Sequence, residues 1–266
     1  TPLEVMRVAI EDDVLVVGGG IAGMTAALAA AEAGADVRLA SKKQSTLRQA
    51  TGLADVLGYA NGALVSNPFE AVDSLRADPP YSIVGTSAIR AGLARFDAVT
   101  GDAYRGAHTD RNALVPTHGG TVKPTARYPE SVAAGLASDE RDMLLVGFEG
   151  LVDFDAPSAA AHLRAAGVPF VTRGVTVPFP LDFEADATTT RWARALEADE
   201  SNVRAAVIDR IAAAHEDAPQ IGLPAVLGLD EHRDLLDALR EALDAAVFEV
   251  PTGPPSLPGI RLEGRY

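Results

Sequence analysis

The chain has 266 residues, 37 acidic against 23 basic, and a formal net charge of −14 at pH 7. Such an acidic chain is a poor direct partner for nucleic acid or for an anionic membrane. Because it contains no cysteine, disulfides, thiolate catalysis and iron–sulfur clusters held by its own side chains are excluded.

Lysine occurs at only three positions, Lys42, Lys43 and Lys123, and every other cation is arginine. An excess of acids with little lysine is typical of proteins kept soluble at high salt, where ions screen the repulsion between like charges. We therefore favour a halophilic protein, with an ordinary acidic protein of the cytosol as the alternative.

The first predicted elements follow residues 1–9, which are expected to be a leader of no clear structural use. Val14–Val17 is predicted to be a strand buried on both faces. A helix then runs to Gly34, and a second strand begins at Val37. The turn between the first strand and the helix matches G-x-G-x-x-G, which predicts a site for a cofactor pyrophosphate at six residues: Gly18, Gly19, Gly20, Ile21, Ala22 and Gly23.

Each glycine of this turn has a predicted reason. The first allows the tight turn, the second lets a phosphate approach the backbone, and the third lets the helix pack closely on the strand. Unpaired amides at the start of the helix would face the phosphate. The alternative is a strand–turn–helix that needs glycine only for packing.

The uncharged run 14–31 is long enough for a membrane span, but its glycines and the preceding acids argue against one and against a secretory signal. We therefore expect a cytoplasmic protein.

The acid that usually binds a ribose hydroxyl about 20 positions after the glycines is missing. Ala40 and Ser41 stand in its place, followed by Lys42 and Lys43. Binding of NAD through its ribose is therefore poorly supported, and a cofactor held mainly by its phosphates is favoured.

A polar loop follows over residues 41–52 and is placed where a flavin would lie. Its candidate cofactor contacts are Ser41, Ser45, Thr51 and Gly52. An ordinary surface loop is the alternative. Helices are then predicted from Phe69 to Arg76 and from Thr86 to Val99.

Residues 100–130 are rich in turn formers and are predicted to be irregular, as functional loops often are. His108 and His118 could act as acid–base groups, although loop histidines are more often exposed to solvent. Arg111, Lys123 and Arg127 form a set that could bind an anion, with a structural role as the alternative. Our candidates for substrate binding are Lys123, Arg127 and His118.

Strands and helices alternate over the rest of the chain, which predicts parallel pairing in a layered α/β protein. Strands are expected at Met143–Phe148, Phe170–Val177 and 248–250. Helices are expected up to Ala166, within 188–214 and from Glu231 to Ala245. The prolines of the tail 251–266 exclude a central strand there. The sequence contains no Gly-x-Ser-x-Gly elbow and no His-Glu-x-x-His helix, so we assign no catalytic residue and no metal site.

Four blocks resemble the B-type subunit of the anaerobic glycerol-3-phosphate dehydrogenases, in a form like those of salt-loving archaea. They are Val16–Gly23, Gln44–Leu47 with Thr51–Gly52, Val146–Phe154, and Pro251–Leu262. The first is shared by many flavoproteins. The blocks Val-Gly-x-x-Gly-Leu-x-Asp-Phe and Pro-Pro-Ser-x-x-Gly-Ile-Arg-Leu are much more specific, and they occur in the expected order.

The resemblance implies a flavin-linked electron-transfer subunit of a complex that oxidises sn-glycerol 3-phosphate to dihydroxyacetone phosphate. Quinone or an anaerobic respiratory chain would take the electrons. It implies FMN rather than FAD, and partner subunits that carry the catalytic FAD, the iron–sulfur clusters and the contact with the membrane. Members of the family are longer, and we expect this chain to be truncated, with weak flavin binding or none.

We predict an FAD/NAD(P)-binding Rossmann-type parallel sheet, possibly incomplete. Residues 1–60 with 141–266 would form the nucleotide-binding α/β domain, and residues 61–140 an inserted, irregular cap or substrate-side region. Two other functions remain open. One is a docking subunit without a cofactor, and the other is an NAD-dependent oxidoreductase.

Overall fold

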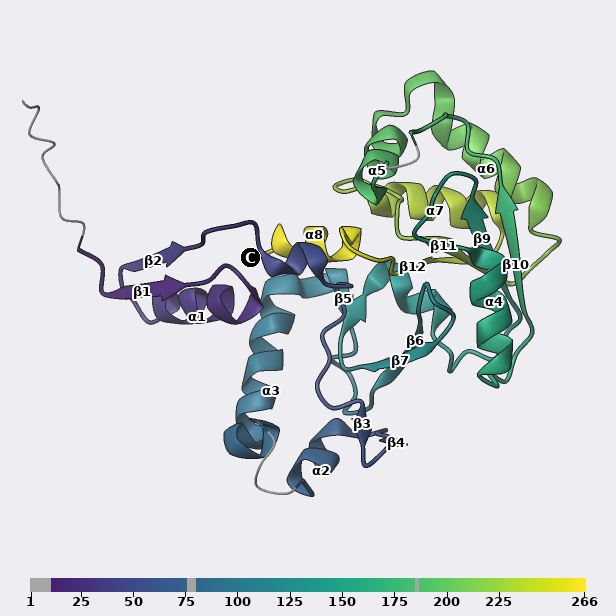
Figure 1. Cartoon of the computed structure of the whole chain (residues 1–266). Helices are drawn as coiled ribbons and strands as arrows, with labels where there is room; N and C mark the ends of the chain where they lie inside the picture. Colours follow the sequence, from purple (N-terminus) through teal and green to yellow (C-terminus); the bar gives the residue numbers. More distant parts are fainter. Residues whose placement is uncertain (1–10, 76–79, 185–186) are drawn as a thin grey trace, which may run out of the picture. The chain divides into compact units, whose positions relative to one another are not determined.

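The computed structural model describes residues 11–75, 80–184 and 187–266. The expected leader at residues 1–9 and the expected helix end at Arg76 lie outside these ranges. The described chain divides into a first unit, residues 11–46 with Tyr266, and a second unit, residues 47–265 (Figure 1).

The first unit is a strand, a helix and a second strand: β1 (Val14–Val17), α1 (Ile21–Glu32) and β2 (Val37–Ala40). The strands pair in parallel, with Val14 opposite Val37 and Val17 opposite Ala40. Gly34 follows the helix with φ of +88°, a conformation that glycine adopts without strain. The three elements predicted from the sequence are confirmed.

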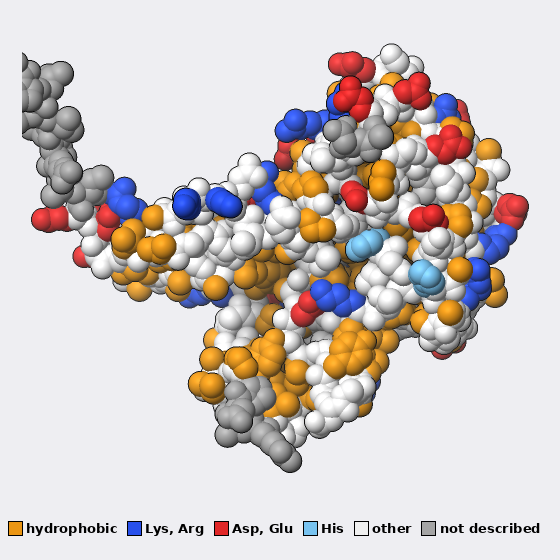
Figure 2. Space-filling view, viewed as in Figure 1, with side chains coloured by type: hydrophobic (Ala, Val, Ile, Leu, Met, Phe, Trp, Pro, Cys, Tyr) orange, Lys and Arg blue, Asp and Glu red, His pale blue; other side chains and the backbone are white. Residues whose placement is uncertain are grey.

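The prediction that β1 is buried on both faces is wrong for this unit. Val16 faces α1, but Leu15 and Val17 point to the other face and are 60% and 80% exposed. The reason is that, among the described residues, β1 pairs with β2 alone, and the only helix of the unit covers one face of the pair. Figure 2 shows hydrophobic side chains exposed along this unit.

The second unit contains a four-stranded parallel sheet in the order β10-β9-β11-β12. Its strands are β9 (Met143–Phe148), β10 (Thr172–Val177), β11 (Gln220–Pro224) and β12 (Ala246–Val250). The helices that connect them are α4 (Ala156–Ala165), α5 (Thr189–Ala198), α6 (Val203–Ala214) and α7 (His232–Leu243). Gln220 pairs with Met143 on one side and with Ala246 on the other. This confirms the parallel α/β architecture.

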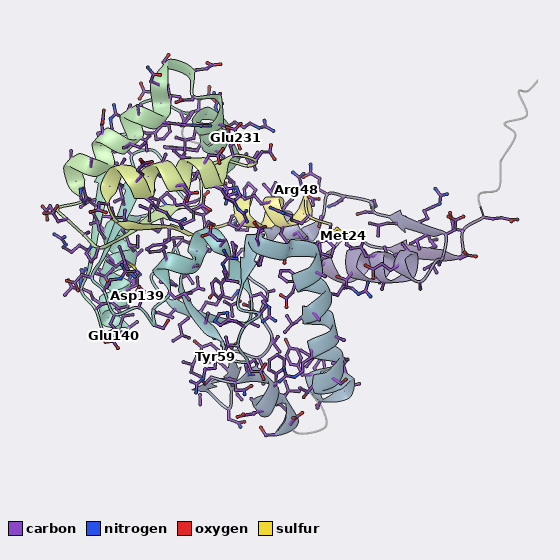
Figure 3. All side chains as sticks on the ribbon, turned by 180° about the vertical axis from the view of Figure 1, so that it is seen from behind. Met24, Arg48, Tyr59, Asp139, Glu140 and Glu231 are labelled. Atoms are coloured by element: carbon purple, nitrogen blue, oxygen red, sulfur yellow. The ribbon has the colours of Figure 1, made fainter. Side chains whose placement is uncertain are left out.

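The two central strands, β9 and β11, are buried along their whole length. The connection from β9 to β10 runs in the opposite direction to that from β11 to β12, so right-handed crossovers place α4 and α7 on opposite faces of the sheet. Helix α7 contributes Leu235, Leu236, Leu239 and Leu243, all at 4% exposure or less. Side chains fill the space between the sheet and its helices (Figure 3).

Residues 46–135 hold further helices and short antiparallel strand pairs. The helices are η1 (Thr46–Gln49, starting in the first unit), α2 (Pro68–Asp73), α3 (Pro80–Thr100), η2 (Gly101–Ala103) and η3 (Glu130–Gly135). The antiparallel strand pairs are β3 (Tyr59–Ala60) with β4 (Ala63–Leu64), β5 (Tyr104–Arg105) with β8 (Tyr128–Pro129), and β6 (Ala113–Pro116) with β7 (Val122–Thr125). The short helix η4 (Glu200–Asn202) lies between α5 and α6, and α8 (Leu257–Glu263) lies near the carboxyl end.

The expectation that residues 100–130 are irregular is corrected by these strand pairs. Strands of two to four residues are too short to show an alternating pattern, and Pro116, Pro124 and Pro129 suggest turns. Prolines are nevertheless compatible with the edges of two-stranded ribbons. The two parallel sheets share no strand pair among the described residues. The assignment of 1–60 with 141–266 to one domain therefore stays a prediction.

None of the helices in the described part of the chain is both long and apolar enough to cross a membrane.

Candidate functional site

The glycine turn between β1 and α1 is the candidate cofactor site of the first unit. Gly18 has φ of +118°, and its amide donates a hydrogen bond of 2.8 Å to the carbonyl oxygen of Ala40 at the end of β2. The turn is therefore tied to the carboxyl ends of both strands. In parallel α/β sheets this is the edge at which ligands bind.

Gly23 shows why the turn needs glycine. A Cβ at this position would lie 1.9 Å from the carbonyl oxygen of Gly18 and 3.5 Å from Cγ1 of Val16. Any other residue would push α1 away from β1. The helix and strand thus approach as closely as the dinucleotide-binding geometry requires.

Gly20 is the residue before the first turn of α1, and no side chain caps the helix there. The first backbone hydrogen bond of the helix runs from the amide of Met24 to the carbonyl oxygen of Gly20, at 2.9 Å. The amides of Ile21, Ala22 and Gly23 therefore have no partner within the helix. They carry the positive end of the helix dipole, which favours an anion.

The arrangement fits the pyrophosphate of a dinucleotide cofactor. A Cβ at Gly20 would lie 2.8 Å from Oγ1 of Thr46, so the Thr46 side chain lies against the turn where only glycine leaves room for it. Gly18, with nothing within 4 Å of a Cβ, faces open space. Gly18 to Gly23 would hold the phosphates, and a flavin bound there would supply redox chemistry.

Ser41 follows β2 directly and lies beside this turn. A Cβ on Gly19 would be 3.1 Å from its Oγ, and the Ser41 hydroxyl donates a hydrogen bond of 2.7 Å to the carbonyl oxygen of Lys43. The structure thus brings the predicted Ser41 together with the glycine turn. Ser45 is buried, at 8% exposure.

Thr51 and Gly52 belong to the second unit, and their predicted contact with a flavin stays a prediction. Gly52 has another role that the structure does show. Its φ is +78°, and a Cβ would lie 2.6 Å from that of Pro258. Its carbonyl oxygen accepts a hydrogen bond of 2.7 Å from the Tyr104 hydroxyl.

Each of the three candidates for substrate binding has a partner within the protein, and their predicted role stays a prediction. The Arg127 side chain is 8% exposed, with Nε and Nη2 paired to Asp97 and Nη1 donating to the carbonyl oxygen of Gly106. These contacts indicate a structural role. Lys123 pairs with Asp55 at 2.7 Å. His118 Nδ1 lies 3.2 Å from the carbonyl oxygen of Pro251.

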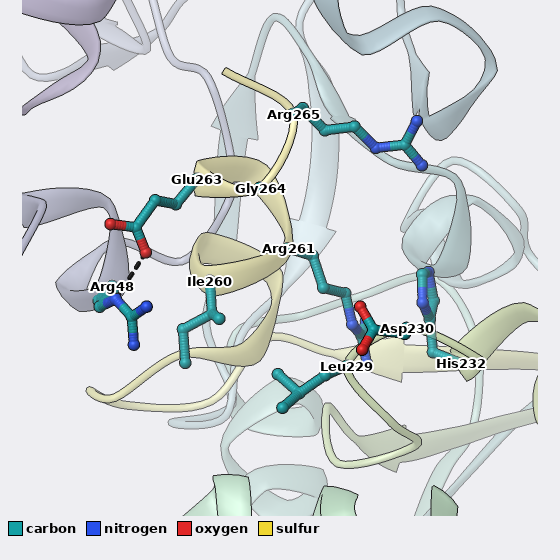
Figure 4. Close-up of a pocket in the computed structure, with 9 residues that line it drawn as sticks. All are labelled: Arg48, Leu229, Asp230, His232, Ile260, Arg261, Glu263, Gly264 and Arg265. Atoms are coloured by element: carbon teal, nitrogen blue, oxygen red, sulfur yellow. Dashed lines mark ion pairs between the residues drawn. The ribbon is translucent and has the colours of Figure 1, made fainter.

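A pocket of about 500 Å³ lies beside α8 in the second unit (Figure 4). It is lined by Arg48, Leu229, Asp230, His232, Ile260, Arg261, Glu263, Gly264 and Arg265. Arg48 Nε contacts a Glu263 carboxylate oxygen at 2.5 Å. None of these side chains was predicted as a site residue from the sequence, although Arg261 lies in the block Pro251–Leu262, which carries the family resemblance.

Arg261 crosses from this pocket into the core. Its Nη1 and Nη2 contact the two carboxylate oxygens of Glu249 at 2.5 and 3.0 Å, and its Nε donates to the carbonyl oxygen of Gly228 at 2.8 Å. Glu249 lies on β12 and is 0% exposed. Burial by itself would raise the pKa of the Glu249 carboxyl, but the guanidinium outweighs it, and the pKa is lowered.

His232, the first residue of α7, has a pKa lowered to about 4. Burial is the main cause, and the positive charge of Arg261 adds to it, while Glu249 acts in the opposite direction. The imidazole is therefore neutral at pH 7. It contributes no positive charge to the pocket.

The strand order of the second parallel sheet reverses between β9 and β11. Beyond the carboxyl ends of the neighbouring pair β9 and β10, the aromatic side chains of Phe148, Phe179 and Trp192 pack together, with Phe179 and Trp192 ring centroids 4.5 Å apart. Among the described residues, no group of three or more His, Asp or Glu side chains could hold a metal ion.

Comparison with known proteins places nearly the whole chain in one family. Residues 13–266 match the family model described as FAD binding domain. The chain is 60% identical, over 264 residues, to the B-type subunit of the probable anaerobic glycerol-3-phosphate dehydrogenase of Halobacterium salinarum, covering 96% of this chain and 62% of that protein. No solved structure matches.

More distant relatives carry the same name. The B-type subunit of the anaerobic glycerol-3-phosphate dehydrogenase of Pectobacterium carotovorum is 31% identical, covering 94% of this chain and 62% of that protein. The corresponding subunit of Vibrio cholerae is also 31% identical, covering 94% of this chain and 61% of that protein. The chain thus spans about three fifths of the length of these relatives.

Proposed function

The chain belongs to the FAD binding domain family, and from this membership we propose that it is the flavin-linked electron-transfer subunit of a glycerol-3-phosphate dehydrogenase. The family match shows the class of cofactor, a flavin. It gives no support to the expected preference for FMN and indicates FAD instead. The resemblance stated from the four sequence blocks is confirmed by the 60% identity to the haloarchaeal protein.

The observation that supports flavin binding best is the open glycine turn. Its amides at Ile21, Ala22 and Gly23 have no partner in the helix, and Gly23 cannot carry a side chain without displacing α1. The pyrophosphate of FAD would receive hydrogen bonds from these amides. We place the adenosine end of FAD beside Ser41, and Ser45 remains a candidate contact.

The substrate and partners are proposed from the relatives, which are named as the B-type subunit of an anaerobic glycerol-3-phosphate dehydrogenase. In this proposal the oxidation of sn-glycerol 3-phosphate to dihydroxyacetone phosphate takes place in an assembly of this chain with further subunits. Those subunits would carry the catalytic FAD site and the iron–sulfur clusters, and they would provide any contact with the membrane. This chain would pass electrons between them.

The visible absorption spectrum of the purified protein tests the cofactor. Flavin bands with an FAD-to-protein ratio near one would support the proposal, and released FAD and FMN are separated by chromatography. A colourless protein that takes up no added flavin would contradict it and favour the docking role. Bleaching of the bands by sn-glycerol 3-phosphate, under anaerobic conditions and only when the partner subunits are present, would support the proposed reaction.

Gly20→Val should remove flavin binding, because its side chain adds bulk where the pyrophosphate approaches the α1 amides. The Thr46 hydroxyl, 2.8 Å from the Cβ position, must rotate to admit it. We expect the affinity for FAD to fall about tenfold or more, with a melting temperature within a few degrees of the parent. Gly92→Val is the matched control, because a Cβ at Gly92 meets nothing within 4 Å. An unchanged flavin content in Gly20→Val would exclude the glycine turn as the site.

A further inference from the structure

Three polar side chains lie together at one end of the pocket beside α8. His232, Arg261 and Arg265 line this pocket and also a second, smaller cavity of the same unit, next to Tyr104 and Pro258. Figure 4 shows both arginine side chains extending from α8 toward the side on which His232 lies. The three side chains therefore face a common space in the second unit.

Two of these polar groups are left without a partner in the protein. Among the described residues, the guanidinium of Arg265 makes no hydrogen bond or ion pair, and its backbone amide is bonded to the carbonyl oxygen of Leu262 at 3.0 Å. Nδ1 of His232 is buried and has no hydrogen-bond partner either. Buried polar atoms in folded proteins are usually satisfied, so these free groups are available to a ligand.

The electrostatic field at His232 is positive. Arg261, Arg233 and Arg265 each act to lower the pKa of the imidazole, whereas among the described carboxylates Glu249 acts to raise it. The imidazole is neutral at pH 7 and adds no charge of its own. An anion that binds beside the ring would thus meet an excess of arginine charge, in a protein whose net charge is −14.

The carboxylates of the lining narrow the class of anion. Glu263 is paired with Arg48 at 2.5 Å, but in the described part of the chain no hydrogen bond or ion pair holds the carboxylate of Asp230. A free carboxylate repels a bare phosphate and accepts hydrogen bonds from hydroxyls. A ligand with a phosphate at one end and hydroxyls at the other suits both Arg265 and Asp230, and the pocket of about 500 Å³ has room for it.

We propose that the pocket beside α8 binds a small phosphate monoester that carries free hydroxyls. Arg265 and His232 donate hydrogen bonds to the phosphate, and Asp230 accepts one from a hydroxyl. Arg261 adds its charge at the phosphate end, while its hydrogen bonds within the core keep it in place. The ester sn-glycerol 3-phosphate belongs to this class, and its choice as the ligand rests on the proposed function. The pocket itself does not involve the glycine turn.

Isothermal titration calorimetry on the full chain tests the proposal with three probes: sn-glycerol 3-phosphate, inorganic phosphate and glycerol. All titrations use the lowest potassium chloride concentration at which circular dichroism shows the folded chain, because salt screens the attraction. The ester should bind about 3- to 10-fold more tightly than inorganic phosphate, as expected for one further hydrogen bond, and glycerol should not bind. Inorganic phosphate that binds as tightly as the ester would overturn the role of the hydroxyls.

Variants of the lining locate the bound phosphate. Arg265→Gln should weaken binding of the ester and of inorganic phosphate about tenfold, and it breaks no contact of the side chain in the fold. Asp230→Ala should remove the preference for the ester. Arg141→Gln is the matched control, because Arg141 lies outside the lining and pairs with Asp139 at the surface; it should leave both affinities unchanged. If Arg265→Gln binds the ester as tightly as the wild type, the proposal is wrong.

The pKa of His232 gives a second readout, by NMR titration of the histidine C2 protons between pH 8 and pH 5. The chain has five histidines, and the resonance of His232 is the one that His232→Gln lacks. The bound phosphate should raise the pKa of His232 from about 4 to about 5 or above, because a nearby negative charge favours the imidazolium. A pKa that does not change at saturating ester would show that the phosphate binds away from the imidazole.

FAD binding, followed in parallel by flavin fluorescence, separates this proposal from the proposed function. If FAD binds and the ester does not, the pocket proposal is wrong and flavin binding stands. If the ester binds and no flavin does, the pocket proposal stands and the electron-transfer role is wrong. A chain that binds neither contradicts both.

Discussion

A buried ion pair between Glu249 and Arg261 joins β12 to helix α8 in the second unit. Glu249 has no exposed surface and Arg261 has a side-chain exposure of 10%, so their ion pair lies inside the protein. Removing one partner of a buried pair leaves an uncompensated charge, which costs far more than the loss of a surface contact. Arg261 is thus needed for the Glu249 carboxylate to remain charged where it is.

Arg261→Leu should lower the free energy of unfolding by about 3–5 kcal/mol, because Glu249 stays buried without its partner. Chemical denaturation with a constant m-value is the measurement. The control is Arg173→Leu, which removes a partner of Glu216 from a pair in which both side chains are well exposed, and it should cost no more than about 1 kcal/mol. Equal effects of the two variants would show that the Glu249 pair is not buried in solution.

His232 should make the stability of the protein sensitive to acid. Its pKa is lowered to about 4 in the fold, below the ordinary value of about 6.5 in the unfolded chain. Between these two values the unfolded chain binds more protons, so stability rises with pH there and is lost as the pH falls from about 6.5 to 4. We expect the loss to be about 2 kcal/mol, since the side chain is partly exposed.

The check is the difference in unfolding free energy between pH 7 and pH 4.5 for the wild type and for His232→Gln. Arg261, Arg233 and Arg265 all act to lower the pKa of His232, and Glu249 acts to raise it. Removal of the imidazole should therefore flatten this part of the profile. A variant whose stability falls with acid as steeply as the wild type would show that other groups are responsible.

At the scale of residues, the sequence predicts the glycines well and the ionic contacts poorly. Gly18, Gly20 and Gly23 stand out because their spacing follows from local geometry, in which the helix must start directly after the strand. The partner of Arg261 or of Arg127 could not be predicted in the same way. Their partners, Glu249 and Asp97, lie on other elements of the fold. The spacing of residues along the sequence does not indicate which elements come into contact.

At the scale of elements, η1 and α8 form a close contact between distant parts of the second unit. A Cβ on Gly259 would lie 2.0 Å from the carbonyl oxygen of Leu47 and 2.3 Å from that of Ala50. The amide of Ser256 donates a hydrogen bond of 3.0 Å to the carbonyl oxygen of Arg48. Two of the sequence blocks that carry the family resemblance therefore meet here, and Gly259 permits their approach.

Gly259→Ala should separate α8 from η1 and lower the melting temperature by about 8 °C or more, equivalent to a loss of about 2 kcal/mol or more. Differential scanning fluorimetry is sufficient to see this shift. Gly264→Ala, in the same segment, is the control, because its Cβ would meet no atom closer than 3.6 Å. Matching melting temperatures for the two variants would argue against the close contact.

Long apolar runs made some elements easy to predict. Met143–Phe148 is such a run, and α7 shows its four leucines at helical spacing. The strand β11 was not predicted, because Gln220, Gly222 and Pro224 interrupt its pattern. Its burial comes from β9 and β12 on either side, which is a property of the sheet. The strand pairs β5 with β8 and β6 with β7 were not predicted for a related reason. Each pair joins two separate segments of the chain, and its short strands show no alternating pattern of their own.

At the scale of the whole molecule, charge is the dominant property. A net charge of −14 opposes the compact state through repulsion, and ions screen it. Figure 2 shows acidic side chains spread over the face around α5 and α6. The 60% identity to a protein of a salt-loving archaeon fits the interpretation that this chain is adapted to high salt.

The melting temperature should therefore rise by about 10 °C or more between 0.1 M and 2 M potassium chloride, concentrations at which the Debye length falls from ~10 Å to below ~3 Å. Potassium chloride is used because sulfate salts also strengthen the burial of apolar surface. A melting temperature that stays flat or falls over this range would contradict the halophilic interpretation.

The contact between η1 and α8 also has a consequence for how the chain is made. Residues 11–46 can form β1, α1 and β2 as soon as they leave the ribosome, because every strand pair in that unit is local. The segment Leu47–Ala50 must instead wait for Ser256 and Gly259, which at ~5–20 residues per second arrive tens of seconds later. During synthesis η1 is thus left without its partner, and a growing chain would depend on chaperones or on salt to keep that surface from binding elsewhere.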